Sequence, residues 1–92
     1  MKFVYPAVFY QNKDDQYIGY FPDLEDCRVS ASSFDECLDK AREAAEDWIL
    51  LELSEDEPLL PPVSDPGDIT LPFNGVVRNI AVIVRFNTGW DE

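Results

Sequence analysis

The sequence predicts an α+β fold of order β-β-β-α-β, in which one helix covers one face of a small antiparallel or mixed sheet. Two observations lead to this expectation. Residues 33–53 form one long amphipathic segment, and apolar residues before and after it alternate with the period of two that strands require. With 92 residues the chain has room for one modest core, so we expect residues 1–92 to form a single domain.

Three strands are predicted before the helix. Residues 2–11 form the first, and Pro6, which has no N–H for a ladder, predicts an edge or a bulge within it. The polar residues 12–15 indicate a hairpin turn into a second strand over 16–21, and residues 27–31 predict a short third strand. The first strand is apolar on both faces, with Phe3, Tyr5, Ala7 and Phe9 on one and Val4, Pro6, Val8 and Tyr10 on the other.

Residues 33–53 predict the helix. Ser33 is placed to accept a hydrogen bond from a first-turn N–H, and Glu36, three residues later, completes a capping-box pattern. Pro58 follows a run of acids and ends the helical pattern. At about 100° per residue, one side of this helix carries an apolar stripe of Phe34, Cys37, Leu38, Ala41, Ala44, Ala45, Trp48 and Ile49.

After the helix, residues 54–75 predict a long irregular connection, because five of the seven prolines lie there. Residues 76–86 then predict the last strand, with Ile80, Val82, Val84 and Phe86 on one face. The chain thus offers one helix to cover one face of a sheet whose first strand is apolar on both faces.

The second face of the sheet therefore needs a cover. We expect a homodimer or a tetramer, or a protein partner, because a monomer would leave an aromatic patch in water. The alternative is that the Pro-rich residues 58–73 fold back over this face. The candidate contact residues on the face are Val4, Val8, Tyr10, Ile18 and Tyr20.

The charge distribution narrows the class of partner. The net charge is −12, and seven scattered Lys and Arg residues do not form the basic patch that nucleic-acid binding requires. The outer side of the helix is acidic although like charges four residues apart destabilise a helix. This favours a basic partner; the alternative is a solvated helix face that serves solubility. The candidate residues for binding a basic partner are Glu36, Asp39, Glu43, Glu46 and Asp47.

The sequence offers little for catalysis. It has no histidine, no nucleotide-binding glycine motif and no nucleophile motif, so we expect no enzyme activity, no metal and no cofactor. Two runs of acids raise the alternative of a magnesium-dependent nuclease, namely Asp23, Glu25 and Asp26, and Glu55, Asp56 and Glu57. Magnesium sites use carboxylates from separate elements, and adjacent acids are more often solvated loops. Without a secretory signal or an apolar run of about 20 residues, and with two cysteines that suit free thiols, we expect a cytoplasmic protein.

Two stretches carry a family resemblance. Tyr17 is followed four residues later by Phe21-Pro22-Asp23-Leu24, and the helix begins Ser33-Phe34 with Glu36, Cys37, Ala41 and Ala44 at set positions. The combination over residues 3–64, with Pro-Pro-Val-Ser after the helix, resembles the HicB-like antitoxin family of bacterial toxin–antitoxin systems. The chain departs from the family pattern at Glu25-Asp26, where Pro-Gly is usual, and at Ser32, where a glycine is common.

The resemblance implies a partial ribonuclease-H-like fold without that enzyme's catalytic acids. It also implies a partner, a small basic HicA-type toxin that cleaves mRNA and is inhibited when the antitoxin docks on it. Many members carry a C-terminal DNA-binding domain, whereas this sequence ends soon after the last predicted strand, so no direct DNA binding is expected. The alternative is a solitary homo-oligomeric protein-interaction domain that has lost its toxin.

Overall fold

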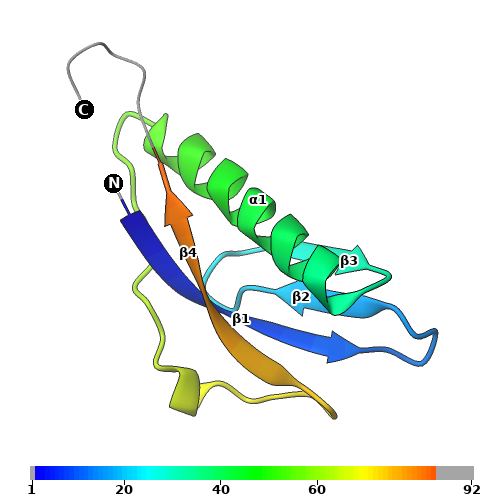
Figure 1. Ribbon diagram of the computed structural model, residues 1–92. Helices are drawn as coiled ribbons and strands as arrows, with labels where there is room; N and C mark the ends of the chain where they lie inside the picture. The colour runs from blue at the N-terminus through cyan, green and yellow to red at the C-terminus, as the bar shows by residue number, and fades with distance from the viewer. Residues whose placement is uncertain (1, 85–92) are drawn as a thin grey trace.

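The computed structural model describes residues 2–84 and shows one sheet with one long helix packed across it (Figure 1). A short 3₁₀ turn, η1, lies in the connection between the helix and the last strand. The α+β fold and the order β-β-β-α-β predicted from the sequence are confirmed. The elements are β1 (Lys2–Gln11), β2 (Tyr17–Tyr20), β3 (Arg28–Ala31), α1 (Phe34–Leu53), η1 (Pro66–Asp68) and β4 (Val76–Ile83). The last strand was expected over residues 76–86; β4 ends at Ile83, Val84 is not part of it, and residues 85 and 86 lie outside the described residues.

The sheet is antiparallel throughout, with strand order β3-β2-β1-β4. β4 pairs with β1 from Lys2 to Phe9, whereas β2 pairs with β1 only from Val8 onward. Pro6 therefore lies where β1 pairs on one side only, which explains how a central strand tolerates a proline. The expected edge at Pro6 exists, and it arises because β2 is short.

One core fills the space between α1 and the sheet. Cys37, Ala41, Ala45 and Ile49 of α1 are fully buried, one turn apart. The small alanines let the helix approach the sheet closely, where it contacts β2, β3 and β4. Burial of such apolar side chains is the main driving force of folding. The sheet contributes the side chains of its helix-facing side and of the β2–β3 loop: Tyr5, Ala7, Phe9, Phe21, Leu24, Cys27, Ala31, Ile80, Val82 and Val84.

The start of α1 follows the predicted cap in part. The Ser33 hydroxyl oxygen accepts a hydrogen bond from the Glu36 N–H at 3.1 Å, as expected of an N-cap residue. The Glu36 side chain does not return to the Ser33 backbone. Its carboxylate instead accepts a hydrogen bond from the Ser32 hydroxyl at 3.1 Å. The position where the family commonly has glycine thus supports the helix start through its side chain.

Hydrogen bonds to residues distant in the sequence attach the Pro-rich connection to the body of the domain. The Tyr5 hydroxyl donates to the Pro61 carbonyl at 2.6 Å, and the Ser64 N–H donates to the Asp23 carboxylate at 2.7 Å. Leu60 also packs against the core. Figure 1 shows the connection passing the start of β1 and then running on the side of the sheet away from α1.

The second face of the sheet is consequently less open than expected. Pro6 and Val8 lie on this face, yet both are buried within the single chain, and Ile18 beside them is 7 % exposed. The path of the connection in Figure 1 agrees with the alternative that residues 58–73 fold back toward this face. The apolar surface that stays accessible here is at Val4 and Ile83, which are 38 % and 57 % exposed.

Candidate functional site

The outer side of α1 is the most strongly charged surface that the sequence predicted as a binding site. We call Glu36, Asp39, Glu43, Glu46 and Asp47 the acidic face. All five lie on α1 and point away from the buried stripe, because they occupy the helix positions between its apolar residues. Four are exposed, whereas Glu46 is half-buried, so it is less accessible than the sequence pattern indicated.

The carboxylates of the acidic face differ in whether they have a cationic neighbour. Glu36 lies 3.7 Å from the Lys40 ammonium, and Asp39 lies 3.4 Å from the Arg42 guanidinium. Both pairs are solvent-exposed, and pairs of this kind contribute little to stability. Within residues 2–84, Glu43, Glu46 and Asp47 have no ion-pair or hydrogen-bond partner. The uncompensated charge of the face therefore lies at these three residues, and Glu43 and Asp47 are the exposed ones, one turn apart.

An apolar side chain continues the line of the acidic face, and the sequence interpretation missed it. Leu50 is 37 % exposed, and it lies seven residues after Glu43, two turns along the same side of α1. Leu51 beside it is 70 % exposed. The signal was available, since winding the helix at about 100° per residue places Leu50 among the acids rather than on the core stripe. Single exposed apolar residues are common on protein surfaces, so Leu50 is of interest here because it extends the line of the acidic face.

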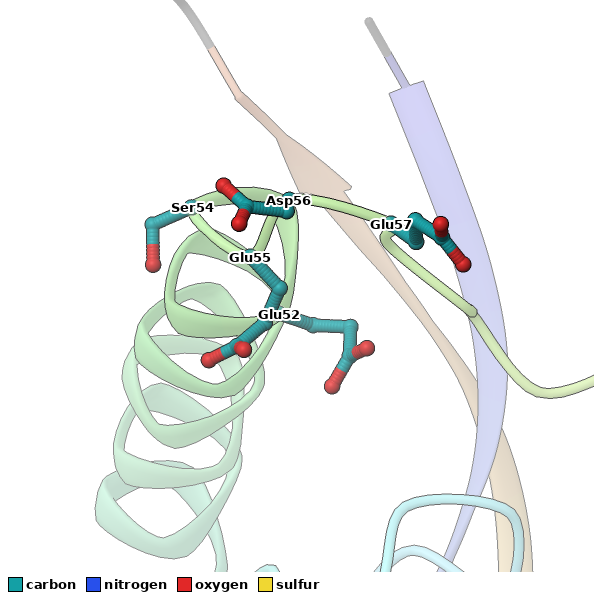
Figure 2. A pocket seen from close by; sticks show the side chains of 5 residues that line it. All are labelled: Glu52, Ser54, Glu55, Asp56 and Glu57. Atoms are coloured by element: carbon teal, nitrogen blue, oxygen red, sulfur yellow. The ribbon is translucent and has the colours of Figure 1, made fainter.

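Acidity extends beyond the end of α1. A wide-open hollow at this end is lined by Glu52, Ser54, Glu55, Asp56 and Glu57. Figure 2 shows the first four at the last turn of the helix and Glu57 farther along the connection. The Glu52 carboxylate accepts a hydrogen bond from the Leu59 N–H at 3.0 Å. The last turn contains no basic residue to offset the negative end of the helix dipole. The acidic face and this cluster together make one side and one end of α1 negative.

The five candidate residues on the second sheet face lie on neighbouring positions of β1 and β2. Val4, Val8 and Tyr10 alternate along β1, and Ile18 and Tyr20 lie beside them on β2. The Tyr10 and Tyr20 rings meet edge to face with centroids 6.4 Å apart, and the Arg28 guanidinium donates to the Tyr10 hydroxyl at 3.2 Å. Because Val8 and Ile18 are buried within the chain, the accessible part of this set is Val4, Tyr10 and Tyr20.

Groups that carry catalytic or metal chemistry do not converge in the part of the chain that the structure describes. No cluster of three or more Cys, Asp or Glu side chains suited to a metal ion occurs among residues 2–84. Asp23, weighed above as a nuclease residue, is engaged by Ser64. Both thiols are buried, and burial raises the pKa of Cys27 to about 11. Such a thiol is protonated at neutral pH and a poor nucleophile.

Among residues 2–84, no helix combines the length and the apolar character that a membrane span requires.

Solved structures with the same fold come from toxin–antitoxin systems. A chain of a "HicA3 and HicB3 toxin-antitoxin complex" is 25% identical with a TM-score of 0.68, covering 89% of this chain and 100% of that one. A chain of a toxin–antitoxin complex from Streptococcus pneumoniae is 25% identical with a TM-score of 0.73, covering 90% of this chain and 70% of that one. The N-terminal domain of the antitoxin HicB from Burkholderia pseudomallei has a TM-score of 0.70 at 20% identity, covering 89% and 100%, and supports the fold alone.

A search of curated proteins found no match. The family model described as UPF0150-like matches residues 5–60, more than half of the 92 residues. This range contains both stretches on which the family resemblance rests, from β1 through the end of α1. The chain therefore belongs to the UPF0150-like family and has the HicB-like antitoxin fold that its sequence predicts.

Proposed function

We propose that the chain is an antitoxin that binds and neutralises a small basic HicA-type mRNA-cleaving toxin by docking, without catalysis of its own. The observation that carries this proposal is the acidic face, where Glu43 and Asp47 have no cationic neighbour within residues 2–84. Membership of the UPF0150-like family and the likeness to chains of toxin–antitoxin complexes support an antitoxin role.

The charge explains how such a complex would form. A toxin that binds RNA presents Lys and Arg, and a surface of opposite charge speeds its capture. The acidic face has the same charge as the RNA backbone, so binding there competes with RNA. The exposed Leu50 on the same line would supply the apolar contact that charges alone lack.

The acidic face is rigid enough to serve this role. It lies on a 20-residue helix whose opposite side is anchored by four fully buried residues. The Trp48 indole N–H also donates to the Glu25 carbonyl at 3.0 Å, which ties the helix to the β2–β3 loop. A partner that docks on α1 therefore meets carboxylates held on a fixed backbone, which lowers the entropic cost of binding.

Co-expression with a small basic HicA-type protein, sought among the products of the neighbouring genes, tests the proposal. We expect the antitoxin to restore growth of cells that express the toxin and to co-purify with it. Absence of both rescue and co-purification contradicts the proposal. That result would favour the alternative, a solitary homo-oligomeric interaction domain without a toxin. The observation that supports this alternative is the apolar surface left accessible at Val4 and Ile83 on the second sheet face.

A further inference from the structure

The two edge strands of the sheet, β3 and β4, differ in how they are protected. β3 has four residues, and the Lys40 ammonium donates to the carbonyl of Ser30 at 3.1 Å. Short edge strands and lysine side chains placed at the edge are both common features that prevent another strand from adding to a sheet. β4 has eight residues, contains neither proline nor lysine, and pairs with β1 one to one without a bulge. The charged residue of β4 is Arg78, whose guanidinium lies 5.8 Å from the centroid of the Phe34 ring, on the helix side of the sheet. β4 thus has little of the usual protection of an edge strand.

The register shows which backbone groups of β4 face outward. Pro6 lies opposite Asn79, and a residue without N–H fits a pair that is not hydrogen-bonded. Residues 77, 79, 81 and 83 then direct N–H and C=O away from β1. The Val77 carbonyl agrees with this, because it accepts a hydrogen bond from the Arg78 guanidinium at 3.0 Å. Within residues 2–84, the outward groups of Asn79, Ala81 and Ile83 have no partner.

The distribution of charge indicates what can approach this edge. The net charge is −12, yet neither β1 nor β4 contains an acidic residue. The carboxylates lie on α1 and in the connections. A basic partner is therefore attracted to these parts of the surface. A second copy of this acidic chain is repelled by α1 and by the loops, and the acid-free edge of β4 is where it meets least repulsion.

We propose that the outer edge of β4 pairs antiparallel with β4 of a second copy. A two-fold axis between identical strands gives a closed dimer and joins two four-stranded sheets into one. The exposed Val4 and Ile83 flank the edge on the face away from α1, and in one register Ile83 of one copy lies opposite Val77 of the other. The dimer contact is thus the sheet edge, with the tyrosines of the second face outside it.

Ala81→Pro is the sharpest test, because the Ala81 N–H points outward and is not used by β1. The matched control is Ala81→Thr, which keeps the N–H. Sedimentation velocity at micromolar concentration is expected to show a dimer for the original chain and for the control. For Ala81→Pro we expect dimerisation at least about tenfold weaker, since two symmetry-related hydrogen bonds are lost. An original chain that is monomeric, or a proline variant that dimerises equally well, overturns the proposal.

Two further measurements keep the test decisive. If Ala81→Pro does not fold, Ala81→Lys retains every backbone donor and places like charges near each other across the axis, so it is also expected to weaken the dimer. Hydrogen exchange is expected to protect the amides of residues 79, 81 and 83 in the isolated dimer. Protection that arises only after the basic toxin is added assigns the edge to the toxin and overturns the proposal. Dimerisation is measured without toxin, so its failure is distinct from failure of the antitoxin function.

Discussion

The Asp23 carboxylate accepts hydrogen bonds from both the N–H and the hydroxyl of Ser64, 41 residues away. This contact fastens the Pro-rich connection to the β2–β3 loop. The Tyr5 hydroxyl donates to the Pro61 carbonyl nearby. Burial, and to a smaller extent the negative charge of Asp23, raises the pKa of Tyr5. Two polar contacts therefore guide a connection that has no regular ladder of its own.

Replacing Asp23 by alanine is expected to destabilise the domain. The change leaves the part-buried Ser64 N–H without its acceptor, at a cost of about 1–3 kcal/mol. Urea unfolding followed by circular dichroism measures the free energy of unfolding. Asp26→Asn is the matched control, because Asp26 is exposed and asparagine tolerates its positive φ of 62°. Equal stability of the two variants would show that the contact contributes nothing.

Gly19→Ala is expected to strain the core. A Cβ at Gly19 would lie 2.7 Å from Cε1 of Phe9 and 3.3 Å from Sγ of Cys37, and both neighbours are fully buried or nearly so. Overpacking of this kind costs about 1–3 kcal/mol. Gly67→Ala serves as the control, since its nearest atom, Oδ1 of Asp65, is 3.5 Å away. The midpoint of thermal unfolding should fall for Gly19→Ala and not for Gly67→Ala. A lowered midpoint in both variants would contradict local overpacking.

The Cys27 thiol makes stability depend on alkaline pH. Burial raises its pKa from 9.0 to about 11, so the unfolded chain releases this proton at lower pH than the folded chain. The free energy of unfolding should be unaffected by this group below about pH 9 and should fall as the pH rises toward about 11.

The original chain and Cys27→Ala are compared by urea unfolding from about pH 7 to about pH 10.5, a range that covers most of this window. Tyr5, whose pKa is also raised, titrates in both proteins, so the difference in pH slope isolates the thiol. We expect the alanine variant to lose less stability at high pH. An identical slope in the two proteins would show that Cys27 is not titrated differently by folding.

Much of the fold followed from local patterns. The alternation of β1 assigned Phe9 and Val8 to opposite faces, and Ser33 was identified as the N-cap because its hydroxyl precedes an amphipathic run. The bonds from Tyr5 to Pro61 and from Ser64 to Asp23 were not predictable, since they join residues 56 and 41 positions apart through a connection without periodicity. The burial of Val8 on the second face depends on packing that periodicity does not specify.

The candidate site was predictable in composition but not in detail. Helical spacing predicted that all five acids lie on one side of α1. That side was expected to face outward, because a charged residue is rarely buried without a partner. Which of them are compensated depends on side-chain positions: Asp39 has Arg42 beside it, whereas Glu43 has no cation. The half-burial of Glu46 likewise reflects its surroundings in the fold rather than its position in the pattern.

The paired variant Glu43→Lys with Asp47→Lys tests the central claim most directly, with Glu55→Lys and Asp56→Lys as the matched control of equal net charge. Toxin affinity is measured by calorimetry or by interferometry. We predict at least about tenfold weaker binding for the acidic-face variant, mainly through slower association, and a much smaller change for the control. Equal losses in both variants, or no loss in either, would contradict docking of a basic toxin on the acidic face of α1.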